Sequence, residues 1–574
     1  MAFQISPGVN VSEVDLTTVV PSVLTTAGAF AGAFQWGPAN KRITVDSEIT
    51  LVSKFSQPNT NTANSFFTAA SFLAYGNNLQ VVRVVGSDSV NARSNTLTTA
   101  IQITNENVFE AEYLTGSAAS LIGPVIARYP GTLGNSITVS TIDSGANFAT
   151  WNIAGFSVNS YFNGAPGTSS QADGLGATND ELHVIVVDTG GLITGSKNTV
   201  LEVFPYLSKA SDAVDSLGNS NYYKNVIFNK SKYIYAVDAP STDPSFSTWG
   251  KPLVVGSTPT TYHIFAAPQL SILSGGTDAL PAAGDLETGY DLFSNADETN
   301  ISLVLTGGAE TAVQQYVIDN VVNSRKDCVA FISPPSAAVV NNVGNETTDI
   351  LAWNTSLARS SSYVVADSGW KYMFDKYNNV YRWIPLNGDI AGLCVYTDSV
   401  RDPWFSPAGF NRGNLKNVVK LAWNPNQTQR DAIYSLGINP VVTFPSNGTI
   451  LYGDKTLQAQ PSAFDRINVR RLFIVLEKTI REAAKYSLFE FNDAFTQAQF
   501  VALVTPFLRD VQGRRGIQDF KVVCDSTNNT PNVVNSNQFV GDIYIKPARS
   551  INFIQLNFVA VRTGVDFTTV VGQF

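Results

Sequence analysis

Residues 302–333 constrain the fold of this 574-residue chain more than any other stretch. Ser302 to Thr306 has the apolar run of a buried strand, and Cys328 to Ser333 has another. Between them, Gly307-Gly308 marks a turn, and Ala309 to Ser324 has the period of an amphipathic helix. Two strands joined through a helix lie parallel in one sheet, so the pattern predicts an α/β body. The apolar face of the helix contains Val313, Tyr316, Val317 and Val321.

Two further helix patterns belong to the same body. Ala63 to Tyr75 has an apolar face, and the strand-like run Leu79 to Val85 follows it after a short turn. Near the C-terminus, Ser462 and Asp465 have the spacing of a capping box, which predicts a helix from there to about Leu488. The apolar stripe of that helix includes Ile467, Leu472 or Phe473, Leu476, Ile480 and Ala484.

Residues 86 to about 275 have a different character. Ser, Thr, Gly and Asn are abundant there, and short strand patterns such as Ile137 to Ser140 and His183 to Val187 alternate with long loops. The richest loop stretch is 143–180. The pattern predicts a β-rich domain inserted into the body. The fold class is therefore mixed α/β (α+β) and multidomain, since 574 residues also exceed the size of one hydrophobic core.

Both ends of the chain contain strand patterns. Residues 5–20 alternate apolar and polar, but no second strand follows to form a hairpin. Late strands are predicted at 520–524, 539–546 and 554–560, the last with strict alternation. We therefore expect the N-terminal strand to pair with something distant.

Charge and hydropathy argue against nucleic acid and membrane partners. The net charge is −9, and only 14% of the residues are charged, so the clustered cations needed for phosphate binding are missing overall. No run of apolar residues is long enough to span a bilayer. Residues 461–574 are the basic part, with 13 Lys/Arg against 10 Asp/Glu. We expect synthesis in a cytosolic compartment.

Residues for catalysis or metal binding are scarce. The two histidines, His183 and His263, have no ligand or base nearby in the sequence, so a structural role is favoured. The cysteines are far apart, which predicts buried thiols in place of disulfides. The turn Gly307-Gly308 lacks the patterns of phosphate-binding loops and favours a simple tight turn. No catalytic, cofactor or metal site is predicted. The cysteines are Cys328, Cys394 and Cys524.

Aromatic residues gather in the second half of the body. They could stack on sugars or bases, but the cations needed for nucleic acid are sparse there, so core and subunit-contact packing is favoured. The residues are Trp353, Trp370, Tyr372, Tyr377, Tyr381, Trp383 and Trp404.

Several blocks of the sequence resemble the tail sheath proteins of contractile-tailed phages (myoviruses). N-terminal blocks are SPGVNVSEVD and FQWGPA, and YPGTLGN begins at Tyr129. The C-terminal blocks are longer and more specific. They are KYMFDKYNNVYRWIPLNGDIAGLC from Lys371, SPAGFNRG, LYGDKT, PSAFDRINVRRLF, VVCDSTNNTP and KPARSINFIQLNFVAVRTG. The departure lies between Asn91 and Arg128, where longer relatives have a larger insertion.

The resemblance implies a structural subunit of a phage tail. Such subunits form stacked hexameric rings around the tail tube, joined to the baseplate and closed by a terminator protein. They contract from a metastable state to drive the tube through the host envelope. The implied domains are an N-terminal arm at 1–20, a body at 21–90 and 274–510, a reduced protruding insertion at 91–128, a β-rich domain at 129–273, and a C-terminal β domain with an arm at 511–574.

The resemblance and the charge pattern assign candidate residues to two contacts. The terminal arms are expected to pair with strands of neighbouring copies. The basic C-terminal part is a hypothesis for the contact with the tube protein, and a solvated helix face is the alternative. Arm candidates are Val9, Val11, Val14, Ile543, Ile545, Ile554, Leu556 and Phe558. Tube candidates are Arg470, Arg471, Lys478, Arg481, Lys485, Arg514 and Arg515.

Two other interpretations remain open. The first is a sheath subunit of a phage-derived contractile injection machine that carries no genome. Its subunits would assemble and contract in the same way, and the presence or absence of capsid genes nearby would distinguish it. An α/β enzyme that uses the Gly307-Gly308 turn is the second, and nucleotide binding by the monomer would support it.

Overall fold

The computed structural model describes residues 25–94, 100–114, 122–239, 244–552 and 554–555. These residues form two compact units. The first contains residues 25–403 and 407–481, and the second, which we call the C-terminal unit, contains Trp404–Ser406 and the described residues from Glu482 on. Among the described residues, every helix is too short or too polar to cross a lipid bilayer.

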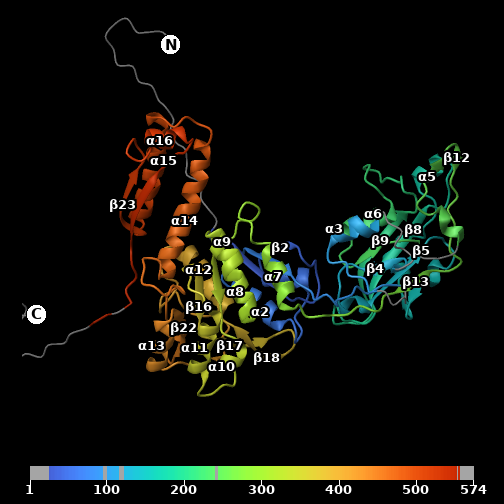
Figure 1. Ribbon diagram of the computed structural model, residues 1–574. Helices are drawn as coiled ribbons and strands as arrows, with labels where there is room; N and C mark the ends of the chain where they lie inside the picture. The colour runs from blue at the N-terminus through green and yellow to red at the C-terminus, as the bar shows by residue number, and fades with distance from the viewer. Residues whose placement is uncertain (1–24, 95–99, 115–121, 240–243, 553, 556–574) are drawn as a thin grey trace, which may run out of the picture. The chain divides into compact units, whose positions relative to one another are not determined.

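A seven-stranded sheet forms the centre of the first unit (Figure 1). Its order is β2-β3-β1-β14-β15-β16-β20, and all neighbours are parallel except β2 and β3. β14 and β15 are the parallel pair predicted from residues 302–333, so the predicted α/β class is confirmed. The strands are β1 (Gly28–Gly32), β2 (Arg42–Val45), β3 (Leu79–Arg83), β14 (Leu303–Leu305), β15 (Val329–Ile332), β16 (Val364–Asp367) and β20 (Ile438–Asn439).

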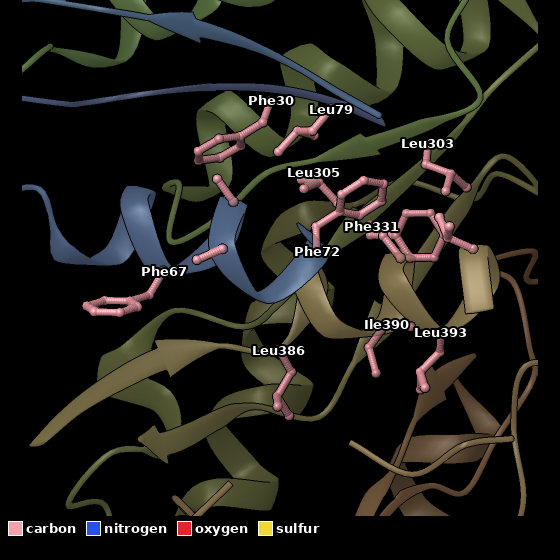
Figure 2. Close-up of a cluster of buried hydrophobic side chains, with 14 of the residues drawn as sticks. Phe30, Phe67, Phe72, Leu79, Leu303, Leu305, Phe331, Leu386, Ile390 and Leu393 are labelled. Carbon is pink, nitrogen blue, oxygen red and sulfur yellow. The ribbon is translucent and has the colours of Figure 1, made fainter. Parts of the chain in front are cut away.

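Helices bury both faces of this sheet, and we call the sheet with its helices the body. Leu303 and Leu305 of β14 belong to one core cluster, whereas Val304 between them belongs to the other. Figure 2 shows the first cluster, in which helix side chains such as Phe72 and Ile390 lie beside strand side chains such as Leu305 and Phe331. The helices of the first cluster are α1 (Glu48–Phe55), α2 (Ala63–Leu73), α12 (Asn387–Val400) and α14 (Ile467–Ala484). Those of the second include α7 (Ala283–Asp291), α8 (Thr311–Tyr316), α11 (Glu346–Leu357) and α13 (Gln427–Ser435).

The helix predicted at 309–324 is present, but it is not uniform. After α8 the chain forms a π-helical segment, Val317–Val322, and then the short α9 (Asn323–Arg325). Val313, Val317 and Val321 are buried as predicted, and Tyr316 is half-buried.

The capping box predicted at Ser462 is wrong. α14 begins at Ile467, and the Ser462 hydroxyl instead accepts a hydrogen bond from the nearby amide of Phe464. The residues just before α14 bond to another part of the chain, since the Asp465 carbonyl accepts a hydrogen bond from the Thr456 amide. The α-helix also ends earlier than the predicted Leu488, and a 3₁₀ turn, Lys485–Ser487, follows it.

Smaller elements complete the body. A three-stranded antiparallel sheet has the order β18-β17-β19, and a separate hairpin joins β21 to β22. Their bounds are β17 (Trp370–Asp375), β18 (Val380–Pro385), β19 (Lys420–Leu421), β21 (Val441–Phe444), β22 (Gly448–Leu451) and α10 (Ser336–Val339).

Between β3 and β14 the chain forms the predicted β-rich insertion, with its own apolar core. Its main sheet is antiparallel with the order β13-β5-β8-β9, and a second small sheet pairs β4 with β10. The strands are β4 (Val125–Ala127), β5 (Ile137–Ile142), β6 (Asn152–Ile153), β7 (Phe156–Ser157), β8 (Glu181–Asp188), β9 (Thr199–Ser208), β10 (Ile234–Ala236), β11 (Val254–Val255), β12 (Thr258–Pro259) and β13 (Gln269–Ile272). The helices are α3 (Glu106–Phe109), α5 (Ser170–Gly174) and α6 (Tyr223–Lys230).

The two chain segments that connect the insertion to the body are bonded to each other. The amide of Val90 donates to the carbonyl of Thr277 at 3.1 Å, and the reverse bond has the same length. The amide of Gly86 also donates to the Ala279 carbonyl at 3.1 Å. The insertion therefore leaves and rejoins the body at one place.

The C-terminal unit contains one long helix and one small sheet. α15 (Ala494–Gly513) buries Phe500, Val504 and Leu508, and the predicted boundary at residue 510 falls inside it. The sheet consists of β23 (Ile517–Val523) and β24 (Asp542–Pro547), which are antiparallel, with the short α16 (Pro531–Asn535) between them.

Candidate functional site

The sheet of the C-terminal unit has only two strands among the described residues. Val522 lies opposite Ile543 and Phe520 lies opposite Ile545. Each strand thus uses one edge for its partner, and its other edge is not paired with a further described strand. A two-stranded sheet is marginal by itself, and unpaired backbone groups at an edge can accept another strand. The predicted late strand is present, and half-buried Ile543 and Ile545 belong to it.

Most of the other arm candidates cannot be placed. Val9, Val11 and Val14 lie outside the described residues, as do Leu556 and Phe558. Ile554 is described: its side chain is 78% exposed, and it belongs to no strand.

Three of the tube candidates are enclosed by the body, so their prediction as a basic exposed face is wrong. Arg470 and Arg471 are only 5% and 4% exposed. The guanidinium of Arg471 lies 2.6 Å from the Asp398 carboxylate, and Arg470 donates to the Ser362 hydroxyl at 2.8 Å. Burial lowers the pKa of Arg470. For Arg471, burial also acts to lower the pKa, but the Asp398 carboxylate outweighs it and the pKa is raised.

Lys478 is the third enclosed candidate. Its ammonium donates to the Ile301 carbonyl at 2.6 Å and lies 3.6 Å from the Asp327 carboxylate. Burial lowers its pKa, and Asp327 acts in the opposite direction. Arg470, Arg471 and Lys478 therefore join α14 to other parts of the body. Long basic side chains can reach carboxylates and carbonyls while their stems pack against apolar surface.

The remaining tube candidates are exposed. They are Arg481, Lys485, Arg514 and Arg515. Lys485 pairs with Glu482 at 2.6 Å, and Arg514 lies 3.6 Å from the Asp510 carboxylate, both at exposed positions of their helices. Exposed pairs of this kind contribute little to stability. Arg514 also lies over the Trp404 ring, with 5.2 Å from its guanidinium carbon to the ring centroid.

Exposed apolar side chains between α14 and α15 were missed by the sequence patterns. Phe489 is fully exposed and has a φ of 71°, a left-handed conformation that is rare for a bulky residue. In the sequence these residues are interrupted by polar ones such as Ser487, Glu490 and Asn492, and the first of them belong to the end of the helix predicted to run to about Leu488. The large exposed side chains are Tyr486, Leu488, Phe489, Phe491 and Phe495.

His183 has the structural role that was predicted. The backbone amide of Tyr206 donates to Nδ1 of His183, which leaves Nε2 to donate to the Gly164 carbonyl at 2.8 Å. The ring stacks on Phe162 with 4.4 Å between centroids, and burial lowers the pKa of His183. His263 is exposed and lies edge-on to Phe246. No group of His, Cys, Asp and Glu in the described residues could hold a metal ion.

The turn at Gly307-Gly308 is the tight turn that was predicted. Gly307 has a φ of 58°, its amide donates to Oδ1 of Asn387 at 3.0 Å, and its carbonyl accepts from Nδ2 of the same residue at 2.8 Å. Both backbone groups of Gly307 are thus bonded within the body. A groove beside the turn is lined by Gly308, Glu310 and Trp370 among others, and its one ionisable group, Glu310, would repel a phosphate.

The cysteines and tryptophans are also where they were predicted to be. All three cysteines are free and buried, and burial raises the pKa of Cys328 and Cys394 to about 12. Trp353, Trp370 and Trp404 are buried. Tyr381, by contrast, is 52% exposed.

Comparisons with known proteins agree with this architecture. Residues 302–457 match the phage tail sheath protein central domain, and residues 459–560 match the phage tail sheath C-terminal domain. The tail sheath protein of Vibrio phage KVP40 is 36% identical over 671 aligned positions, which cover 99% of this chain and 100% of the relative. The tail sheath protein of Enterobacteria phage T4 is 33% identical, with 99% of each chain covered.

A solved structure shows the same fold at low identity. The sheath tail protein Lin1278 of Listeria innocua has a TM-score of 0.51 and 12% identity, covering 93% of this chain and 97% of that one. The resemblance found in the sequence motifs is therefore confirmed. This chain belongs to the tail sheath protein family of contractile-tailed bacteriophages.

Proposed function

We propose that this chain works by packing against copies of itself and not by catalysis. It polymerises as stacked hexameric rings in a helical array around the tail tube. Contraction from a metastable extended state drives the tube through the host envelope for genome ejection. The observation that carries the proposal is the two-stranded sheet of β23 and β24, whose outer edges are unpaired among the described residues.

Terminal arms of neighbouring copies supply strands to this sheet. The N-terminal arm contributes the strand with Val9, Val11 and Val14, and the C-terminal arm contributes the one with Ile554, Leu556 and Phe558. Added strands satisfy the amide and carbonyl groups at both edges, and apolar side chains on alternate positions cover the sheet. Because main-chain bonds hold each link, copies can rotate and slide during contraction without leaving the lattice.

Contraction in this scheme consumes no nucleotide. The energy is stored during assembly, because the extended lattice is higher in free energy than the contracted one. Release by the baseplate exchanges one set of subunit contacts for another, a bistable packing change of the kind that interfaces support. The body, with its seven-stranded sheet buried on both faces, transmits this movement as a rigid piece.

The remaining partners meet the lattice at its inner surface and its two ends. The exposed cations Arg481, Lys485, Arg514 and Arg515 are the proposed contacts with the tube protein. The baseplate binds one end of the sheath and the terminator protein binds the other. The subunit is made in the host cytoplasm and becomes part of the virion.

Deletion of residues 1–20 tests the arm. The truncated protein should remain a folded monomer, because the core clusters described for the body are built from residues 29 onward, and it should form no sheath-like tubes. Sedimentation and electron microscopy measure assembly, and circular dichroism measures folding. Normal tubes from the truncated chain would remove the N-terminal arm from the mechanism.

Point variants control for the loss of chain length. Serine at Val9, Val11 and Val14 removes the apolar side chains but keeps the backbone, and it should weaken assembly. Alanine at the intervening Asn10 and Ser12 is the matched control and should leave assembly unchanged. Equal effects of the two sets would contradict a strand with one covered face.

A further inference from the structure

The sheet of β18, β17 and β19 buries one face and leaves part of the other exposed, since Trp370 at one end of that second face is buried and Trp383 packs in part against the same core. On β17, Lys371 and Met373 point inward and are 1% and 7% exposed. Tyr372 lies between them and points outward with Phe374, as the two-residue period of a strand requires. Tyr381 and Trp383 of β18 lie opposite these two in the register. We call Tyr372, Phe374, Tyr381 and Trp383 the aromatic face.

The rings of the aromatic face are held against each other before any partner binds. The centroids of Tyr372 and Trp383 are 4.6 Å apart, and those of Phe374 and Tyr381 are 5.2 Å apart. Tyr372 and Tyr381 stack at 5.4 Å with an interplanar angle of 18°. Phe374 is 44% exposed and Tyr381 is 52% exposed. Rigid aromatic surface of this kind lowers the entropy cost of association and is enriched at protein interfaces.

A lysine without a carboxylate partner lies on these rings. The Lys420 ammonium is 5.1 Å from the Tyr372 centroid and 5.5 Å from that of Trp383. In the described part of the chain, no carboxylate lies within ion-pairing distance of it, whereas nearby Lys376 pairs with Glu48 and Arg382 pairs with Asp375. A partner that fits this surface must therefore offer apolar groups for the rings and a negative charge for Lys420.

The chain itself carries a surface with these properties. Residues 285–298, from α7 into the loop that follows it, contain five Asp/Glu and no Lys/Arg. We call residues 285–298 the acidic segment. Its Glu298 lies 3.6 Å from Arg42, but Glu287 and Asp297 have no cation within ion-pairing distance among the described residues. Just before α7, Leu280 is 59% exposed and offers an apolar contact.

We propose that the aromatic face and Lys420 of one copy bind the acidic segment and Leu280 of a second copy. Two different surfaces of the same chain then meet, which is a heterologous contact and generates rings or open helical polymers in place of closed dimers. This contact joins folded bodies directly, and it is additional to the exchange of terminal strands. The inference rests on the proposed function, since it assumes that copies of this chain assemble.

Charge reversal tests the pairing on the full-length chain. K420E should raise the concentration needed for assembly about tenfold, which corresponds to about 1.4 kcal/mol per contact. The double variant E287K/D297K should have a similar effect. The combination of all three changes should restore assembly to near the wild-type concentration, because opposite charges face each other again. K54E reverses another exposed lysine, on α1, as the matched control and should change nothing.

The readouts separate this contact from folding and from the proposed function. Sedimentation and electron microscopy measure assembly, and the thermal midpoint of the monomer should stay within 1 to 2 °C (about the effect of a neutral surface change). Normal assembly of K420E would overturn the proposal. So would a loss of assembly that E287K/D297K does not rescue, or a loss of tube binding with assembly unchanged. Failure of wild-type protein to assemble would instead contradict the proposed function.

Discussion

The body and the C-terminal unit differ in how far their large apolar side chains are exposed. In the body, Phe331 of β15 is fully buried between helices and neighbouring strands. In the C-terminal unit, Phe489 is fully exposed and Phe491 is 84% exposed. The body has seven strands in its sheet, whereas the unit has two among the described residues. Under the proposed function, the difference means that the body is complete as a monomer and that the C-terminal unit is completed by assembly.

The largest expected effect on stability comes from replacing a phenylalanine with alanine in the body, compared with the same replacement in the C-terminal unit. Phe331→Ala should lower the free energy of unfolding by about 3–5 kcal/mol, because it leaves a cavity in a closed core. Phe489→Ala should change it by at most about 0.5 kcal/mol, because the ring has no contacts to lose. Denaturant unfolding of the monomer measures both.

A conservative variant controls for the side-chain change. Phe331→Leu keeps most of the volume and should cost clearly less than Phe331→Ala. Similar losses for Phe331→Ala and Phe489→Ala would break the comparison, because they would mean that the apolar side chains of the C-terminal unit are already packed in the monomer.

The two regions should also differ in how their stability depends on pH. Burial raises the pKa of Asp367, at the end of β16, to about 8. Since its folded pKa lies above the unfolded one, stability is greatest at low pH and falls as the pH rises from about 4 to 8, by up to about 1.4 kcal/mol per pH unit. In the C-terminal unit, hydrogen bonds from the first turn of α15 lower the pKa of Asp493, so its contribution is lost as the pH falls below its unfolded value.

Asp367→Asn tests the body's part of this behaviour. The variant keeps one oxygen acceptor, which can serve the Gly369 amide, and places an amide NH2 beside the Ser333 hydroxyl in place of the second carboxylate oxygen, so that the titrating group is removed. The decline of the thermal midpoint between pH 4 and 8 should become shallower than in the wild-type protein. Asp431→Asn is the control, since that aspartate is exposed on α13 and should leave the decline unchanged. An equal decline in both variants would mean that Asp367 ionises without cost.

The smallest expected effect on stability is a change of charge on the C-terminal unit. Reversing Lys485, Arg514 and Arg515 to glutamate should leave the thermal midpoint nearly unchanged, because all three side chains are exposed and the ion pairs of Lys485 and Arg514 contribute little there. The same variant should bind the tube protein less well at low salt, and the difference should shrink as salt screens the contact. Co-sedimentation measures binding. The matched control reverses Lys197, Lys230 and Lys232 on the insertion, and equal losses would refute a specific tube contact.

The body could be predicted from the sequence because its patterns are local. The strands at 303–305 and 329–332 and the helix between them have their period within about 30 residues, so no distant contact was needed to see them. The helix start at Ile467 was missed because Ser462 satisfied a capping pattern that the tertiary contacts of the preceding chain overrode.

The candidate site was predicted less well, since the burial and pairing of its side chains depend on residues far away in the sequence. Arg471 pairs with Asp398, which lies 73 positions away, and a single sequence contains no signal of that pairing. A helical stripe of cations therefore suggested an exposed basic face. The strand with Ile543 and Ile545 was predicted because alternation is local, and so was a strand at 520–524, but the pairing of the two and their unpaired edges became visible only in the fold.

The insertion is attached to the body through two chain segments that are already bonded together at Val90 and Thr277. Because the ends of the inserted sequence are held side by side, the body can fold around almost any sequence of compatible ends placed between them. Natural selection can then lengthen, shorten or exchange that domain while the contractile machinery stays intact. For the same reason, this junction is the position of choice for replacing the insertion with a foreign domain in an engineered chain.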